Sequence, residues 1–166
     1  MTLLRHLFAI LLLPFMVVVI IPRWILRAWS PWDTRWIGGT LPAAFAHVAG
    51  ILLFLCGFAL FAWCVSLFAR IGRGTLAPWA PPRSLVASGP YRLSRNPMYI
   101  AVILVLLGWA ALFRSRTLLV YALAVAIAFH LRVLVSEEPW ARRTFGADWE
   151  DYRARVPRWL LRLRKS

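Results

Sequence analysis

Four apolar stretches constrain this chain more than any other feature of its sequence. They cover residues 7–21, 43–69, 98–113 and 117–135. A helix needs about 20 apolar residues to cross the hydrocarbon of a bilayer, so the second and fourth stretches are long enough and the other two need flanking residues. Hydrophobic side chains make up 61% of the 166 residues, which is too many for a soluble domain of this size. The sequence therefore predicts an all-α, polytopic membrane protein, with about four transmembrane helices in a single domain, residues 1–166.

The first stretch has a second interpretation, as a secretory signal peptide, because Arg5 precedes its apolar core. A cleavage site with small residues does not follow, since the next residues are Arg23-Trp24-Ile25-Leu26-Arg27. We therefore expect a retained membrane helix, kinked at Pro14. Residues 23–42, rich in Trp, Pro and Gly, are then expected to form a connector at the membrane interface.

The basic residues predict the orientation of the helices. The chain has 20 Lys and Arg residues but only six acids, for a formal net charge of +14. Most of the basic side chains fall on one side if both termini and the loop 70–97 are cytoplasmic, as the positive-inside rule requires. Such a charge could also indicate nucleic-acid binding, but no basic soluble domain or recognition motif is present. We expect no nucleic-acid partner, and expect attraction to the lipid headgroups of the bilayer instead.

A short connection, Arg114-Ser115-Arg116, makes the last two apolar stretches an antiparallel helical hairpin. The hairpin brings Arg95-Asn96-Pro97 and Glu137-Glu138 to the same face of the membrane. An acidic pair at a membrane boundary is unfavourable unless a positive group lies on it. In so basic a chain, that group could be an arginine or a cationic ligand, and this choice bears directly on function.

The tail, residues 136–166, is expected to be a cytoplasmic amphipathic segment. Phe145-Gly146 has the pattern of a helix end with a glycine cap. A second helix, ended by Pro157, then places three apolar residues on one face: Trp149, Tyr152 and Val156. Three arginines are expected to point elsewhere: Arg153, Arg155 and Arg158. This segment would form an interfacial helix or a lid packed against the hairpin.

Other kinds of site are only weakly indicated. The three histidines, His6, His47 and His130, lack metal-ligand spacing, so no metal is expected. A haem held by His47 and His130 is a minor alternative, and His130 is better interpreted as a hydrogen-bonded packing residue. Cys56 and Cys64 are about 12 Å apart along one helix, which is too far for a disulfide.

Five short segments follow one another within about residues 70–160: Gly89-Pro90-Tyr91-Arg92, Arg95-Asn96-Pro97-Met98-Tyr99, Glu137-Glu138, Phe145-Gly146 and Val156-Pro157-Arg158. In this order they resemble the isoprenylcysteine carboxyl methyltransferases and phospholipid methyltransferases, which are integral membrane enzymes. That family shares Gly-Pro-Tyr-Arg, Arg-His-Pro-x-Tyr-x-Gly, a hairpin, a double Glu and a tail motif that ends in Val-Pro-Arg.

Three positions depart from the family pattern. Asn96 replaces the usual His, Ala101 replaces the usual Gly, and Trp149 replaces the first Tyr of the tail motif. Asparagine can donate and accept hydrogen bonds, but it cannot carry a proton near neutral pH as histidine can. The departures therefore bear on the substrate more than on the methyl donor.

The resemblance implies S-adenosyl-L-methionine as the cofactor, bound at the cytoplasmic end of the hairpin and covered by the tail. Its carboxylate would suit Arg92 or Arg95, and its ammonium would suit Glu137. Tyr91 and Tyr99 could contact the adenine or the sulfonium. The full set of expected cofactor-binding residues is Tyr91, Arg92, Arg95, Asn96, Pro97, Tyr99 and Glu137.

The implied reaction is methyl transfer to a lipophilic or membrane-embedded acceptor: a prenylcysteine carboxylate, a lipid amine or a small thiol. Two residues are the expected catalytic ones, Arg132 to orient an anionic acceptor and Glu138 as the base for an amine. Two alternatives remain. One is a non-enzymatic protein for lipid binding or assembly, which Asn96 favours. The other is a nicotinamide-dependent membrane reductase, against which the double Glu argues.

Overall fold

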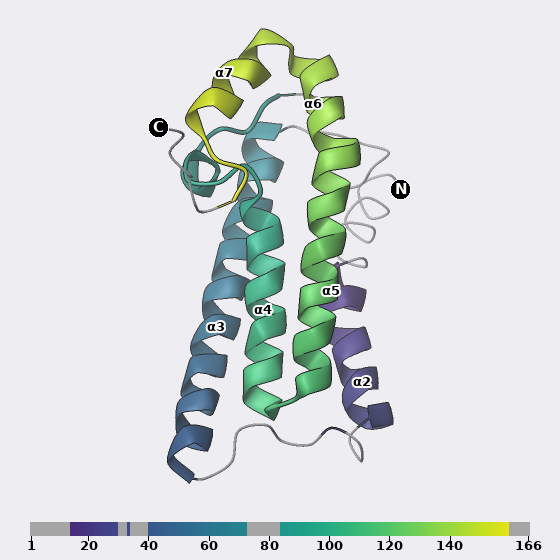
Figure 1. Cartoon of the computed structure of the whole chain (residues 1–166). Coiled ribbons are helices and arrows are strands. Elements are labelled where there is room, and N and C mark those ends of the chain that lie inside the picture. Colours follow the sequence, from purple (N-terminus) through teal and green to yellow (C-terminus); the bar gives the residue numbers. More distant parts are fainter. Residues whose placement is uncertain (1–13, 30–32, 34–39, 73–83, 160–166) are drawn as a thin grey trace, which may run out of the picture.

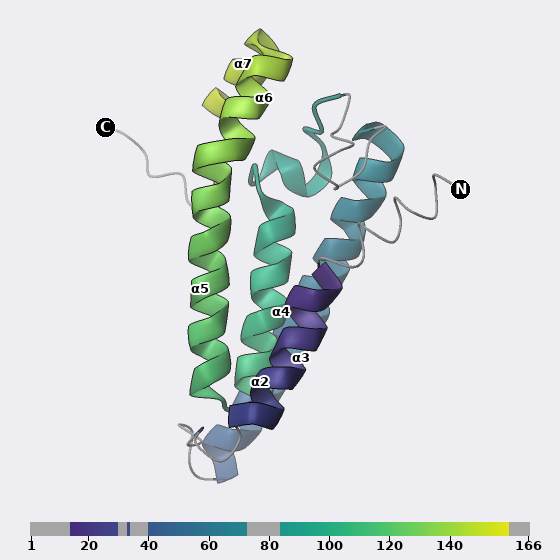
Figure 2. The ribbon, with the colours of Figure 1, turned by 90° about the vertical axis from the view of Figure 1, so that its right-hand side faces the viewer.

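Helices make up the regular structure of this protein. The computed structural model describes residues 14–29, 33, 40–72 and 84–159, and those residues form no β-strand. Three long helices stand side by side, with α4 in the middle (Figure 1): α3 (Thr40–Leu67), α4 (Pro97–Phe113) and α5 (Arg116–Arg132). Near the α4–α5 turn lies α2 (Ile21–Trp29), and at the opposite end lie α6 (Glu138–Phe145) and α7 (Ala147–Arg155) (Figure 2). The prediction of an all-α fold is confirmed.

Among the described residues, two helices are long and apolar enough to cross a membrane: α3, and the continuous helix Arg116–Phe145 that contains α5 and α6. Most residues in their most apolar windows are not buried by the rest of the protein. Large apolar side chains, such as Phe45, Phe58 and Ile127, are exposed along them. The core helix of a soluble protein would bury such side chains, whereas a bilayer solvates them. The third predicted span corresponds to α4, an apolar helix of 17 residues. Of the first predicted span, residues 7–13 lie outside the described residues.

The predicted connector at residues 23–42 is wrong at both ends, because helix α2 continues to Trp29 and α3 begins at Thr40. Pro22 lies inside a continuous helix, and the residues after it remain helical as far as Trp29. A π-helical turn, Met16–Ile20, precedes it, and the Ile21 amide donates to the Met16 carbonyl. Proline has no N–H, and its ring clashes with the carbonyl one α-helical turn back. The wider π turn relieves this clash without ending the helix.

Pro139 shows the same arrangement. A π-helical turn, Val133–Glu137, precedes it, and the Glu138 amide donates to the Val133 carbonyl. The sequence predicted a span that ends at Val135, followed by a separate tail. Instead, the helix continues to Phe145, so Glu137 and Glu138 lie within it.

Tyr121 of α5 stabilises the turn before Pro22. Its hydroxyl donates to the Val17 carbonyl at 2.9 Å, close to the position where proline supplies no amide. We expect Tyr121→Phe to lower the free energy of unfolding in detergent micelles by about 1 kcal/mol. A matched change on the exposed side of the same helix, Val120→Thr, should leave it unchanged. Equal effects of the two variants would contradict this role for the hydroxyl.

The predicted antiparallel hairpin is confirmed. Arg114, with φ of 51°, adopts the left-handed conformation that ends α4. Ser115 caps α5 by accepting a hydrogen bond from the Leu118 amide at 3.0 Å. Asp33 adds a second cap, because it accepts from the Arg116 amide at 3.0 Å and from the Ser115 hydroxyl. The loop before α4 and the acidic pair therefore lie at the same end of the molecule (Figure 1).

Candidate functional site

The carboxylate of Glu138 is held by two arginines at the hairpin end. Arg95, in the loop before α4, donates from Nη1 to Oε1 at 2.8 Å. Arg158, which follows α7, donates from Nε to Oε1 and from Nη2 to Oε2, both at 2.7 Å. Only 9% of the Arg95 side chain and 15% of the Glu138 side chain are exposed. Charge-assisted pairs of this kind are strong, and the bidentate one also fixes the direction of the guanidinium.

Arg95 has unused capacity for hydrogen bonding. Its Nε is buried, and no described residue accepts a hydrogen bond from it. The guanidinium also lies 5.5 Å from the centre of the Trp149 ring, a cation–π distance. Burial lowers the pKa of Arg95, and the carboxylate of Glu138 opposes that shift. Because arginine stays protonated in proteins, this side chain can offer a charged donor to an anionic group.

Glu137 points to a different and more open set of partners. Its Oε1 accepts from the Tyr99 hydroxyl and from Arg132 Nε, the latter at 2.9 Å. The side chains of Arg132 and Glu137 are 51% and 36% exposed. Tyr99 in turn stacks on Phe129, with ring centres 4.2 Å apart. Neighbouring residues of a helix face different directions, so the two glutamates hold two separate networks.

The predicted buried face of the tail is confirmed. Trp149, Tyr152 and Val156 pack in one cluster with Ala141. The Tyr152 hydroxyl donates to the backbone carbonyl of Tyr91 at 2.7 Å, which joins the tail to the loop before α4. Burial raises the pKa of Tyr152 to about 12, so the hydroxyl keeps its proton and remains a donor near neutral pH.

The sequence pattern predicted that Arg158 points away from the site, and this prediction is wrong. Helix α7 ends at Arg155, and Val156 is extended, with φ of −114° and ψ of 127°. Arg158 is therefore outside the helical register on which the expectation rested, and it turns back to Glu138. The Val-Pro-Arg motif of the family pattern already included Arg158, but its direction was inferred from helical spacing. Sequence reasoning also missed Trp159, whose Nε1 donates to His130 Nδ1 at 3.1 Å.

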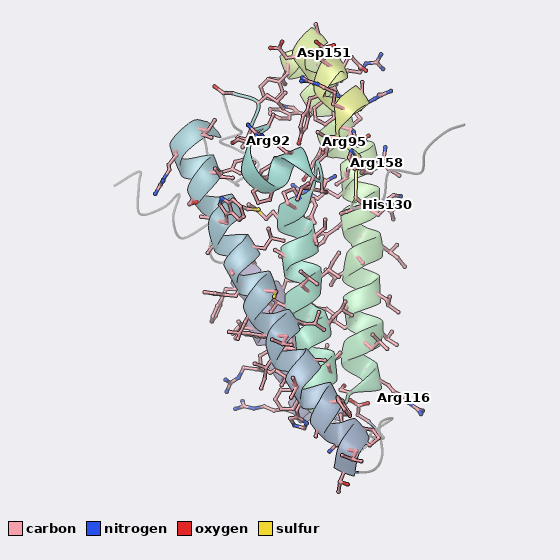
Figure 3. All side chains as sticks on the ribbon, turned by 90° about the vertical axis from the view of Figure 1, so that its left-hand side faces the viewer. Arg92, Arg95, Arg116, His130, Asp151 and Arg158 are labelled. Atoms are coloured by element: carbon pink, nitrogen blue, oxygen red, sulfur yellow. The ribbon has the colours of Figure 1, made fainter. Side chains whose placement is uncertain are left out.

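Two predicted residues have surroundings other than the ion pairs of the two glutamates. Tyr91 is buried against Cys64 and Val86 and packs edge-on to Phe68. Arg92 is exposed, on the α3 side of the loop, whereas Arg95 lies on the α5 side (Figure 3). The predicted residues that the structure does bring together at the hairpin end are Arg95, Asn96, Tyr99, Arg132, Glu137 and Glu138, with Pro97 buried as the first residue of α4.

Comparison with known proteins identifies the family. The family model described as phospholipid methyltransferase matches residues 45–148, which run from α3 into α7. The chain belongs to the phospholipid methyltransferase family. This confirms the resemblance found in the sequence, and as the family consists of integral membrane methyltransferases, the protein is a membrane protein.

A curated relative is named as a resistance protein, not as a methyltransferase. The nickel-cobalt-cadmium resistance protein NccN of Alcaligenes xylosoxydans xylosoxydans is 30% identical over 137 residues, which are 81% of this chain and 56% of the relative. The chain thus spans little more than half the length of that relative. No solved structure matches the chain.

Asn96 has a defined contact in this phospholipid methyltransferase family member. Its side-chain Nδ2 donates to the Arg158 carbonyl at 3.0 Å, and its backbone N–H donates to the Ser94 hydroxyl at 3.1 Å. Asn96 therefore binds the backbone of the tail, at the position where the family pattern has histidine.

A hollow of about 500 Å³ lies beside the tail and is separate from these networks. It is open to solvent, and its lining contains none of the predicted site residues: Ser84, Leu85, Ala87, Phe145, Asp148, Asp151, Tyr152 and Arg155. The candidate site of this family member is therefore the hairpin end with its two glutamates, not the hollow.

Proposed function

We propose that this protein transfers a methyl group from S-adenosyl-L-methionine to a lipophilic or membrane-embedded acceptor. One observation carries the proposal: Arg95 and Glu138 pair beside Tyr99 and Glu137 at one hairpin end, in a member of a methyltransferase family. We also propose four spans, with both termini cytoplasmic, from the distribution of basic residues.

The side chains at the hairpin end fit this cofactor. Its amino-acid part carries a carboxylate, and Arg95 offers a buried Nε to which the described part of the chain supplies no acceptor. It also carries an ammonium, and the partly exposed Glu137 carboxylate has both of its described contacts on Oε1. The stacked rings of Tyr99 and Phe129 offer an aromatic surface for a positively charged sulfonium. When bound, the cofactor would supply an electrophilic methyl group.

Two residues are proposed to act on the acceptor. Arg132, which is paired with Glu137, is half exposed, so it can orient an anionic group of a lipophilic molecule. Glu138 is the candidate base for an amine acceptor, but both of its oxygens are occupied, so it would first have to be released from Arg158. A carboxylate or thiolate acceptor needs no base. For such acceptors, the contribution of the protein is alignment and exclusion of water by the tail.

The proposal is tested by ligand binding to purified protein. S-adenosylhomocysteine should raise the melting temperature, because a ligand that binds only the folded state stabilises it. Glu137→Gln removes a charged partner and should weaken the affinity measured by calorimetry by roughly 10- to 100-fold. A matched change on α7, Glu150→Gln, should leave the affinity unchanged, because the partners of Glu150 are exposed arginines.

The two possible failures of this test are distinct. If Glu137→Gln bound the ligand as tightly as the wild type, the role of Glu137 would be refuted. If the wild-type protein showed no shift in melting temperature, the methyltransferase proposal itself would fail. The non-enzymatic membrane protein would then be the better reading.

A further inference from the structure

We propose that residues 156–159 form a strap that closes the candidate site, and that the strap must open before a ligand binds there. The inference rests on the proposed function, and it concerns the access of ligand to that site. The strap begins where α7 ends and crosses the loop before α4. Arg95 and Arg158 lie together at this crossing, near His130 (Figure 3).

Polar contacts hold most of the strap. The Arg95 amide donates to the Pro157 carbonyl at 2.9 Å, and the Ser94 hydroxyl and Asn96 amide group both donate to the Arg158 carbonyl. Trp159 binds His130 on α5. Val156 is buried, but the three residues after it are only partly buried. A segment held by hydrogen bonds and one ion pair, with little apolar burial, belongs to the less stable part of a fold.

Arg158 occupies one carboxylate of the candidate site. Its guanidinium binds both oxygens of Glu138, the carboxylate that also holds Arg95. With the strap closed, the Arg95 side chain is 9% exposed, and its buried Nε has no hydrogen-bond acceptor among the described residues. Opening the strap would expose the Arg95 guanidinium, which is proposed to hold the cofactor carboxylate, and would free Glu138, the proposed base for an amine acceptor. Arg158 therefore acts as an internal competitor for the site.

The competition predicts an unusual effect of Arg158→Gln. Apparent affinity is reduced by the fraction of molecules in the competent state, so releasing the strap should tighten binding. We expect the dissociation constant for S-adenosylhomocysteine to fall roughly tenfold in calorimetry, with faster association in stopped flow. Independently of any ligand, hydrogen exchange at the Arg95 amide should become faster, since its acceptor is the Pro157 carbonyl. The control is Arg155→Gln, because Arg155 is exposed and its Nε donates to the Asp151 carbonyl of its own helix.

Each outcome bears on the strap. Tighter binding and faster exchange in Arg158→Gln, with neither in Arg155→Gln, support it. Weaker or unchanged binding overturns it, because Arg158 would then be a ligand-binding or a structural residue. If even the wild-type protein binds no S-adenosylhomocysteine, the proposed function fails, and unchanged exchange at Arg95 would separately overturn the strap. Should Arg158→Gln fail to fold, Trp159→Phe removes only the hydrogen bond to His130, and smaller changes in the same directions are required.

Discussion

Replacing Glu138 by Gln is expected to lower the free energy of unfolding by about 3–5 kcal/mol. The carboxylate accepts three hydrogen bonds from two guanidiniums, and only 15% of the side chain is exposed. Glutamine keeps one acceptor, but it places an NH₂ against a donor and removes the negative charge. Arg95, which is 91% buried by the same measure, is then left as an uncompensated charge. Reversible unfolding in detergent micelles measures this loss.

Glu137→Gln is the matched control, because it makes the same chemical change one residue earlier. Its partner Arg132 is half exposed, and exposed ion pairs contribute about 0–1 kcal/mol. The two variants should therefore differ by at least 2 kcal/mol. A double-mutant cycle with Arg95→Met sharpens the test, because the double variant should be less destabilised than the sum of the single variants. Equal losses for Glu137→Gln and Glu138→Gln would contradict the assignment of Glu138 as the central ion of the site.

Local sequence patterns were enough to predict the helical hairpin. Three residues between two apolar runs leave room only for a tight turn, and a tight turn places Arg95 and Glu138 at one end. The two π turns were not predicted. A proline in a sequence is read as a helix boundary, and Pro22 and Pro139 follow wider turns that let the helix continue. Nothing local distinguishes these outcomes, because the compensating partners come from elsewhere, such as Tyr121 for Val17.

The candidate site was predictable to the extent that it depends on order along the chain. The family pattern pointed to Arg95, Asn96 and the two glutamates, and the hairpin explains why they meet. The direction of Arg158 was not predictable from helical spacing, because it depends on the extended backbone of Val156 after α7. The burial of Tyr91 likewise follows from its packing against Cys64 on α3, a contact between distant parts of the sequence.

The packing of α3 on α4 depends on glycines that the sequence analysis did not single out. A Cβ at Gly57 would lie 2.7 Å from the Ala101 carbonyl oxygen and 2.9 Å from the Val105 nitrogen. Gly108 and Gly50 approach in the same way further along the helices. Small residues let transmembrane helices pack this closely. Ala101, where the family pattern has glycine, is fully buried, and Gly57 provides the space for its backbone from the opposite helix.

Gly57→Ala should therefore destabilise the protein by about 1–3 kcal/mol, although alanine is the better helix former. The added methyl group meets backbone atoms, which cannot rotate away, so α3 and α4 must separate. Since α4 carries Tyr99 in its first turn and directly follows the loop that holds Arg95, we also expect weaker binding of S-adenosylhomocysteine. The control is Ala59→Val on the exposed side of α3, which adds more volume toward the surroundings and should change neither quantity. If Gly57→Ala were as stable as wild type in detergent, the close approach of these two helices would be disproved.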